Sequence, residues 1–265
     1  MVFWGIVICV VVGAVAAGLS LVVNKIFPDE NRADDTEAIG FIFCVVGVLY
    51  AIVLAFVLID VWTKFTAAGD AASAEATALI EEYRYAETLP DAQRFQIQRL
   101  ARDYATHVIG VEWQRMDRRE GVGLEGYGIL DELRAAVQNS RPEASGPQDN
   151  VVTEEAGPSA WSYAVSQGDV LAQARDVRIA AAREGIPSVV WFVLIGGLIL
   201  SVGQAFVFKV GGIVTQLVLT VGLTVMTTLI LWSVFQLEYP FSRQLNVEPD
   251  AFEFAVARFA QLSGG

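Results

Sequence analysis

Long apolar windows constrain this chain more than any other feature of its sequence. A helix that spans a bilayer needs about 20 consecutive, predominantly apolar residues. Four windows reach that length: Val2 to Phe27, Ala38 to Trp62, Ser188 to Phe208 and Gly211 to Phe235. Only 18% of the residues are charged, against about 25% in ordinary soluble domains. The sequence therefore predicts an all-α, polytopic membrane protein with four transmembrane helices.

The four windows divide the chain into two hairpins, an insert and a tail. We expect residues 1–62 and 188–236 to form the transmembrane hairpins, and residues 237–265 to form a C-terminal segment. Residues 63–187 are predicted to form a helical domain with a mobile loop at about 140–158, which is polar and contains several prolines and glycines. The first window has no basic residue at its start and is longer than the roughly 7–15 apolar residues of a signal peptide, so we expect a retained helix.

Basic residues predict which side of the membrane holds the insert. An even number of crossings puts both termini and the insert on the same side. Of the 18 Lys and Arg residues, only Lys25, Arg32 and Lys209 belong to the two short connections on the other side. Because basic residues close to the spans favour the cytoplasmic side, the insert and both termini are expected in the cytoplasm. The net charge of −12 argues against a nucleic-acid partner, which would require a basic surface.

Helical periodicity continues from the second span into the insert. Pro90 is expected to end this long helix, and Asp91 is expected to cap the next one, which runs to about Arg119. Further helices are predicted at about 129–138 and 160–184. The second span therefore leads directly into a cytoplasmic helical bundle.

Five stretches occur in an order and spacing that resemble a known family. They read GVLYAIVLAFVLIDVW, EATALIEEYRYAETLP, RLARDYATHVIGVEW, GIPSVVWFVLIGG and YPFSRQLNVEPDAF. As an ordered series they cover nearly the whole chain, which resembles the bacterial bestrophin-like domain family. At the positions of Glu238 and Arg243 that family usually shows Asp and Gly, so this chain departs from the pattern there.

The resemblance implies a channel rather than an enzyme. Bestrophins are oligomeric anion channels whose pore is lined by the second span, and the resemblance brings no enzymatic activity and no cofactor. It implies that the expected partners are membrane lipid, inorganic ions and further copies of the chain, arranged in a ring of five by analogy. It also implies a location in the bacterial inner membrane.

The second span offers candidate pore-lining residues on one face. An apolar face could form a dewetting constriction, and charged side chains below it could select ions. The candidates are Val46, Leu49, Val53, Phe56, Asp60 and Lys64. A ring of Asp residues suits cations better than anions, which conflicts with anion conduction. The alternative is that Asp60 and Lys64 form an interfacial pair one helical turn apart.

A polar face is predicted on the fourth span. Its members recur at helical spacing: Gln216, Thr220, Thr224 and Thr227. Their amide and hydroxyl groups could coordinate a dehydrated anion, or they could form hydrogen bonds between helices, as Thr often does in membranes. Both interpretations are open from sequence.

A buried polar network is predicted inside the insert. The structural candidates are Glu75, Tyr83, Arg84, Glu112 and Trp113, with Glu81 and Glu82 as further possible members. The same carboxylates could bind a divalent cation, but the chain has one histidine and no EF-hand spacing, so no metal site is predicted. No catalytic motif is present, and we expect no enzymatic activity.

Two functions from different classes follow from the sequence. The first is an oligomeric, bestrophin-like ion channel that conducts anions through a pore lined by the second span. The alternative is a non-conducting membrane scaffold or sensor, whose cytoplasmic domain contacts a protein partner through the acidic loop at 142–158. The subunit number separates them, because a pore needs several copies of a four-span chain.

Overall fold

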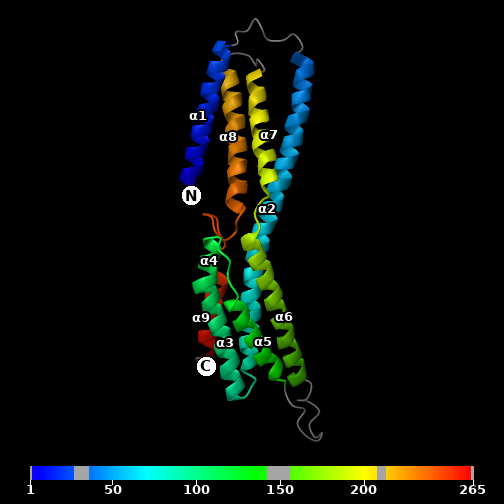
Figure 1. Cartoon of the computed structure of the whole chain (residues 1–265), viewed down its shortest axis with the longest axis vertical. Coiled ribbons are helices and arrows are strands. Elements are labelled where there is room, and N and C mark those ends of the chain that lie inside the picture. Colours follow the sequence, from blue (N-terminus) through cyan, green and yellow to red (C-terminus); the bar gives the residue numbers. More distant parts are fainter. Residues whose placement is uncertain (1, 27–35, 142–155, 208–212, 264–265) are drawn as a thin grey trace. The chain divides into compact units, whose positions relative to one another are not determined.

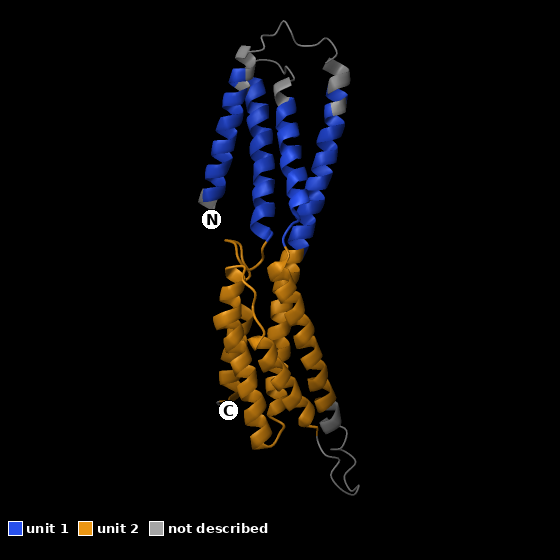
Figure 2. Cartoon of the chain, in the orientation of Figure 1, with its two compact units in different colours: residues 1–63, 185–238 blue, residues 64–184, 239–265 orange. Residues whose placement is uncertain are grey.

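The structure is a computed structural model that describes residues 2–26, 36–141, 156–207 and 213–263. Within these ranges every regular element is a helix, which agrees with the predicted all-α class. The chain divides into two compact units, one made of residues 1–63 and 185–238 and the other of residues 64–184 and 239–265 (Figure 2).

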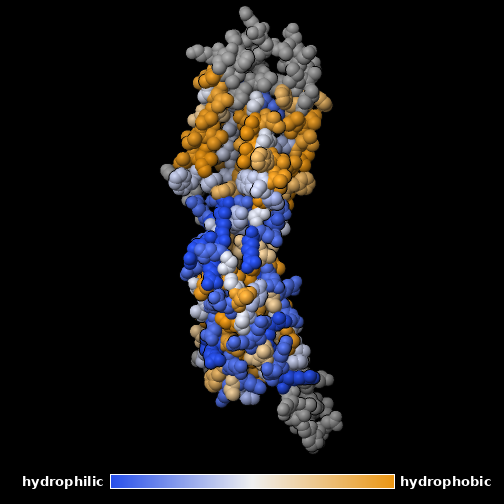
Figure 3. All heavy atoms as spheres, viewed as in Figure 1, coloured by the Kyte–Doolittle hydropathy of each residue, from blue (hydrophilic) through white to orange (hydrophobic). Residues whose placement is uncertain are grey.

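The first unit consists of long apolar helices (Figure 1). They are α1 (Val2–Ile26), the first half of α2 (Thr36–Ala86), α7 (Ser188–Val207) and α8 (Ile213–Leu237). Helix α8 packs against both α1 and α7. Apolar side chains cover the visible surface of this unit (Figure 3).

Among the described residues, two helices are long and apolar enough to cross a membrane: Phe43–Ala86 and Val214–Leu237. A third is counted if Ala160–Arg183 and Ser188–Gln204 are taken together, and Trp4–Leu19 is a shorter apolar helix. The membrane character of the chain is therefore supported. The number of four spans stays a prediction.

Small residues let the helices of the first unit approach each other. A methyl group on Gly5 would lie 2.9 Å from the indole nitrogen of Trp232, and one on Gly13 would lie 3.3 Å from Val225. Such close approach through small residues is typical of helix packing in membranes, where apolar burial gives little driving force.

Cys9 is buried and Cys44 is exposed, and both are free thiols.

The second unit is a helical bundle. It contains the second half of α2, α3 (Asp91–His107), a π-helical turn (Val108–Glu112), α4 (Trp113–Asp117), α5 (Glu125–Asn139), α6 (Ala156–Arg183) and α9 (Asp250–Ser263). Helix α3 packs against α5 and α9, and α5 packs against α6. Polar side chains dominate its visible surface (Figure 3).

Aromatic contacts tie α9 into this bundle. The rings of Tyr83 and Phe259 stack with centroids 4.3 Å apart. The Trp113 indole meets Phe241 and Phe252 edge-on, at 5.3 Å and 5.9 Å. Edge-to-face and offset-stacked rings are the favoured aromatic geometries. No helix was predicted within 237–265, so α9 is an element that the sequence analysis missed.

Several predicted boundaries differ in the structure. Pro90, not Asp91, is the N-cap of α3, and the Asp91 carboxylate instead pairs with Arg94 at 2.5 Å. The single helix expected from 91 to about 119 is interrupted by the π-helical turn, because Val108 to Glu112 carry an extra residue per turn. Helices α5 and α6 begin a few residues before their predicted starts. Most of the predicted loop at 140–158 lies outside the described residues.

Candidate functional site

The pore-lining candidates of α2 lie on the surface of the single chain. Phe56 is 68% exposed, Leu49 is 58% exposed and Val53 is 37% exposed. Val46, one turn before Leu49, is half-buried. This apolar face of α2 is therefore available to lipid or to another copy of the chain.

The charged candidates follow on the same helix. Asp60 and Lys64 are exposed, and each of them interacts with other groups. They are one helical turn apart, a spacing that suits an ion pair on a helix surface. The roles of all six α2 candidates stay predictions.

A neighbouring face of α2 is fixed against α7. The Tyr50 hydroxyl donates a hydrogen bond to the Leu194 carbonyl oxygen at 3.0 Å. A methyl group built on Gly197 would overlap the Tyr50 ring, whereas Gly196 has open space at that position. Leu54 and Val61 are buried on this side. These contacts orient α2 and leave the Phe56 side outward.

The polar face of α8 is buried within the first unit. Gln216, Thr220, Thr224 and Thr227 are each less than 9% exposed. The Thr224 hydroxyl donates to the Thr220 carbonyl oxygen at 2.7 Å, and the Thr227 hydroxyl donates to the Leu223 carbonyl oxygen at 2.8 Å. These bonds stay within one helix, the usual arrangement for threonine in a membrane helix. In the single chain, two of the threonine hydroxyls on this face therefore have hydrogen-bond partners within α8 and do not require a bound ion.

A four-membered ion network fills the centre of the second unit. Arg178 donates to both Glu75 oxygens at 2.6 Å and 2.9 Å, and to Glu112 at 2.8 Å. Arg175 donates to both Glu112 oxygens at 2.5 Å and 3.0 Å. All four side chains are fully buried. Two carboxylates therefore balance two guanidinium groups in the interior.

Tyrosine and tryptophan rings enclose this network. The Tyr104 hydroxyl donates to Glu75 at 2.5 Å and accepts from Arg175 at 2.9 Å. The Arg178 guanidinium lies 5.5 Å from the centre of the Trp113 indole ring. A buried charge is tolerated only when it is paired and hydrogen-bonded, and these contacts supply both conditions.

The network shifts the pKa values of Glu112, Arg178 and Tyr104. Burial by itself would raise the pKa of Glu112, but hydrogen bonds and charge from Arg175 and Arg178 lower it below its usual value. Burial would likewise lower the pKa of Arg178, but the charge and hydrogen bonds of Glu75 raise it. Burial and the neighbouring Glu75 charge raise the pKa of Tyr104 well above its usual range. The Glu112 carboxylate and the guanidinium groups of Arg175 and Arg178 therefore stay charged at physiological pH.

The predicted network residues fall in different places. Glu75 and Glu112 belong to the ion network, and Trp113 packs on it. The Tyr83 hydroxyl lies apart, hydrogen-bonded to Ser263 at 2.6 Å.

Arg84 was wrongly expected to be part of the buried network. Its side chain is 53% exposed and pairs with the half-buried Glu81 at 3.0 Å on the surface. Its neighbour in the sequence, Tyr83, points into the core instead. A one-residue step along a helix turns the side chain through more than a quarter of a turn, which explains the difference.

The two arginines of the network were not predicted from the sequence. From the sequence, Arg175 and Arg178 were counted only among the basic residues of the insert and termini, although they share the buried face of α6 with Leu171 and Ala174. The signal that could have revealed them is their spacing: both arginines occur where the helical repeat of Leu171 and Ala174 predicts a buried, apolar residue.

Glu82 forms a second, unusual feature of this unit. Its side chain is fully buried, and neither carboxylate oxygen has a hydrogen-bond partner among the described residues. Gly168 of α6 lies against it, since a methyl group there would approach one Glu82 oxygen to 3.0 Å. Burial raises the pKa of Glu82 to about 8, and the charge of Arg134 opposes this shift. Glu82 therefore differs from the paired carboxylates of the ion network.

Within the described residues, no group of three or more His, Cys, Asp or Glu side chains is arranged to hold a metal ion. Glu75 and Glu112, two of the carboxylates considered from the sequence as ligands of a divalent cation, are paired with arginines instead. The network is therefore arranged as an internal brace between α2, the π-helical turn and α6.

A family model matches the sequence of this chain, and several solved structures share its fold. A family model described as the bestrophin-like domain matches residues 10–252. A crystal structure of a bacterial bestrophin homologue from Klebsiella pneumoniae, carrying a leucine-to-threonine mutation, has a TM-score of 0.69 at 13% identity and covers 99% of each chain. A second mutant of that homologue, isoleucine to threonine, has a TM-score of 0.70 at 12% identity over 97% of this chain and 98% of that one.

A further crystal structure, of a membrane protein with a proline-to-alanine mutation, has a TM-score of 0.69 at 13% identity and covers 99% and 98% of the two chains. No curated protein matches the sequence. At such identities the solved structures show a shared fold, and the family model covers most of the chain. This chain belongs to the bestrophin-like domain family.

Proposed function

We propose that this chain is a subunit of a bestrophin-type ion channel in the bacterial inner membrane, in which copies of α2 surround an axial pore. Family membership supports the channel class, and the titles of the similar structures name a bacterial bestrophin homologue. The observation that carries the proposal for this chain is the exposed apolar face of α2 around Phe56. In an assembly, this face would contact a second copy of the chain or line the pore.

The length of α2 also suits a pore wall. The helix runs without interruption from Thr36 to Ala86, although its apolar part ends near Trp62. A pore wall built from it would continue past the bilayer, about 30 Å of hydrocarbon, and lead into a cytoplasmic vestibule. The basic residues near the spans favour the cytoplasm for the second unit and both termini.

Anion conduction is the finer part of the proposal. Asp60 disfavours anions unless its charge is offset, and Lys64, one turn further on, is placed to do so. The constriction would then be apolar at Leu49, Val53 and Phe56, and its gating would depend on dewetting. The proposal assigns no ion path to α8, because two of its threonine hydroxyls are bonded within the helix.

Subunit counting combined with conductance tests the proposal. Native mass spectrometry and particle images of the protein in nanodiscs should show a closed ring, with α2 nearest the axis. Reconstituted wild-type protein should conduct, and its reversal potential should follow a chloride gradient. A monomer, or a compact dimer without an axial opening, would contradict the proposal and favour the scaffold or sensor.

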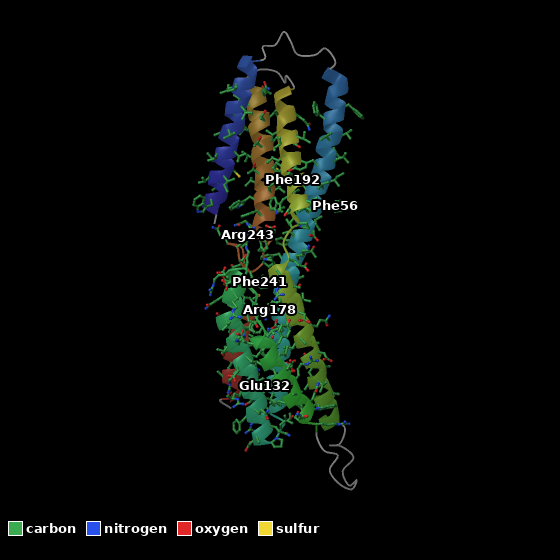
Figure 4. All side chains as sticks on the ribbon, viewed as in Figure 1. Phe56, Glu132, Arg178, Phe192, Phe241 and Arg243 are labelled. Atoms are coloured by element: carbon green, nitrogen blue, oxygen red, sulfur yellow. The ribbon has the colours of Figure 1, made fainter. Side chains whose placement is uncertain are left out.

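Two phenylalanines provide a matched pair for the conductance test (Figure 4). Phe56 of α2 is 68% exposed and Phe192 of α7 is 83% exposed, so both are apolar surface residues of one chain. Phe56→Ala should change single-channel conductance severalfold because it widens the constriction. Phe192→Ala should leave it within about twofold. Equal effects from both variants would argue against α2 as the pore wall.

A further inference from the structure

Gly168 of α6 lies next to both the buried Glu82 carboxyl and an arginine of α5. A methyl group on Gly168 would lie 3.0 Å from one Glu82 oxygen, 3.6 Å from Cγ of Arg134 and 3.9 Å from Nε of Arg134. Both side chains therefore border the point that a side chain at position 168 would fill. Because an arginine side chain has several rotatable bonds with staggered minima, a change of rotamer brings the Arg134 guanidinium to Glu82.

Arg134 is paired with a different carboxylate in the structure. Its Nη2 donates to Oδ1 of Asp169 at 2.5 Å, and the two side chains are 33% and 69% exposed. An ion pair with this exposure contributes little to stability, because water and salt screen its charges. Arg134 can therefore leave Asp169 at small cost.

The charged groups on the helices around Glu82 identify Arg134 as its available partner. On α2, the adjacent Glu81 pairs with Arg84. On α3, Arg102 is hydrogen-bonded to two hydroxyl groups, and the two buried arginines of α6 belong to the ion network. Burial raises the pKa of Glu82 to about 8, and the charge that opposes this rise is that of Arg134 on α5.

Ionisation of Glu82 would place a carboxylate in the interior. Such a group is strongly disfavoured unless it is paired and hydrogen-bonded. Glu75 and Glu112 meet this condition through arginines, whereas the Glu82 oxygens have no hydrogen-bond partner among the described residues. Exchanging the exposed Arg134–Asp169 pair for a buried pair between Arg134 and Glu82 therefore becomes favourable once Glu82 loses its proton.

We propose that Glu82 is a proton-binding site that decides the partner of Arg134. While the proton is bound, Arg134 pairs with Asp169 and connects α5 with α6. When the carboxyl O–H bond breaks and the proton passes to solvent, the Glu82 carboxylate accepts hydrogen bonds from Arg134, which then connects α5 with α2. Asp169 becomes solvated. The exchange takes place within the second unit and does not depend on conduction.

Infrared spectroscopy of the full-length protein in detergent measures the protonation of Glu82. A protonated carboxylic acid has a carbonyl band that a carboxylate lacks, and carboxyl groups with ordinary pKa values of about 4 have lost this band above about pH 6. The wild type should keep a band there that is absent from Glu82→Gln, and should lose it with a midpoint at about pH 8. If the wild type showed no such band above pH 6, the proposal would be overturned.

The exchange of partners is tested by removing each partner of Glu82 and Arg134 in turn. Arg134→Gln should raise the midpoint by about one pH unit or more, which is a tenfold tighter hold on the proton. Asp169→Asn should lower it by about half a unit or more, because Arg134 is released to Glu82. In the Arg134→Gln background, Asp169→Asn should leave the midpoint unchanged. An equal lowering in both backgrounds would show that Asp169 acts only through its charge and would refute the exchange.

Glu132→Gln is the matched control for the loss of a negative charge. Glu132 is an exposed carboxylate of α5, the helix that carries Arg134 (Figure 4). This variant should leave the midpoint close to that of the wild type, and a shift as large as that of Asp169→Asn would contradict the proposal. Since the Arg134 and Asp169 side chains both reach the surface, we expect their variants to fold like the wild type.

Discussion

Glu82→Gln should change how the stability of this protein depends on pH. Glu82 is fully buried, its carboxylate has no hydrogen-bond partner in the part of the chain that the structure describes, and burial raises its pKa from 4.5 to about 8. It lies on α2 about 20 residues past Trp62, in the charged part of the helix that belongs to the second unit. The charged groups nearby are Arg134 of α5 and its partner Asp169 of α6.

The direction of the pH effect on stability follows from the pKa values of Glu82 in the unfolded and folded states. The folded state holds a proton on Glu82 up to about pH 8, whereas the unfolded chain loses it near pH 4.5. The folded state therefore binds more protons in this window, and the free energy of unfolding falls as pH rises through it. One pKa unit corresponds to about 1.4 kcal/mol, so the wild type should lose about 3–4 kcal/mol between pH 5 and pH 8 through Glu82. Glutamine cannot ionise and removes this loss.

Thermal unfolding of the full-length protein in detergent measures the effect. At pH 5 the variant and the wild type should unfold at similar temperatures, because both side chains are neutral. At pH 8 the variant should unfold at a temperature higher by roughly 7 °C or more, on the scale of 2–4 °C per kcal/mol for domains of this size.

The adjacent carboxyl supplies the control. Glu81 is a half-buried residue that pairs with Arg84 on the surface, so Glu81→Gln should shift the whole profile without changing its shape. If the pH profiles of Glu82→Gln and the wild type ran parallel, the buried Glu82 carboxyl would not be neutral in the folded state. The explanation through burial would then be refuted.

Two further predictions concern packing and the ion network. Gly197→Ala should weaken the α2–α7 contact, because its methyl group would overlap the Tyr50 ring, whereas Gly196→Ala has open space and should be neutral or slightly stabilising; melting temperatures of the two variants in detergent provide the comparison, and equal values would count against this packing. Glu112→Gln should destabilise the fold by about 3–5 kcal/mol, because it leaves buried guanidinium groups without their shared carboxylate, while Arg84→Gln on the surface should cost less than about 1 kcal/mol. A Glu112 variant as stable as the Arg84 variant would show that the network contributes little.

Periodicity and composition predicted much of the helical organisation. Long apolar runs and 3.6-residue spacing are local properties, so the helical class and most helix positions could be inferred from the sequence. The helix at 250–263 was missed because it is short and its apolar face becomes meaningful only when Phe252 and Phe259 meet partners in the bundle. The π-helical turn at 108–112 has no distinct sequence signature and depends on the surrounding packing.

The site shows the same division between local and distant information. The combination in α2 of an apolar face containing Phe56 with a charged continuation could be inferred from the sequence alone, because both follow from residues close together in the chain. The pairing of Glu75 and Glu112 with Arg175 and Arg178 is visible only in the folded chain, since the paired residues are 63 to 103 positions apart in the sequence. Residue type alone cannot distinguish a solvated charge from a buried one. That distinction depends on which helix faces come together and exclude water, and this is a property of the folded chain.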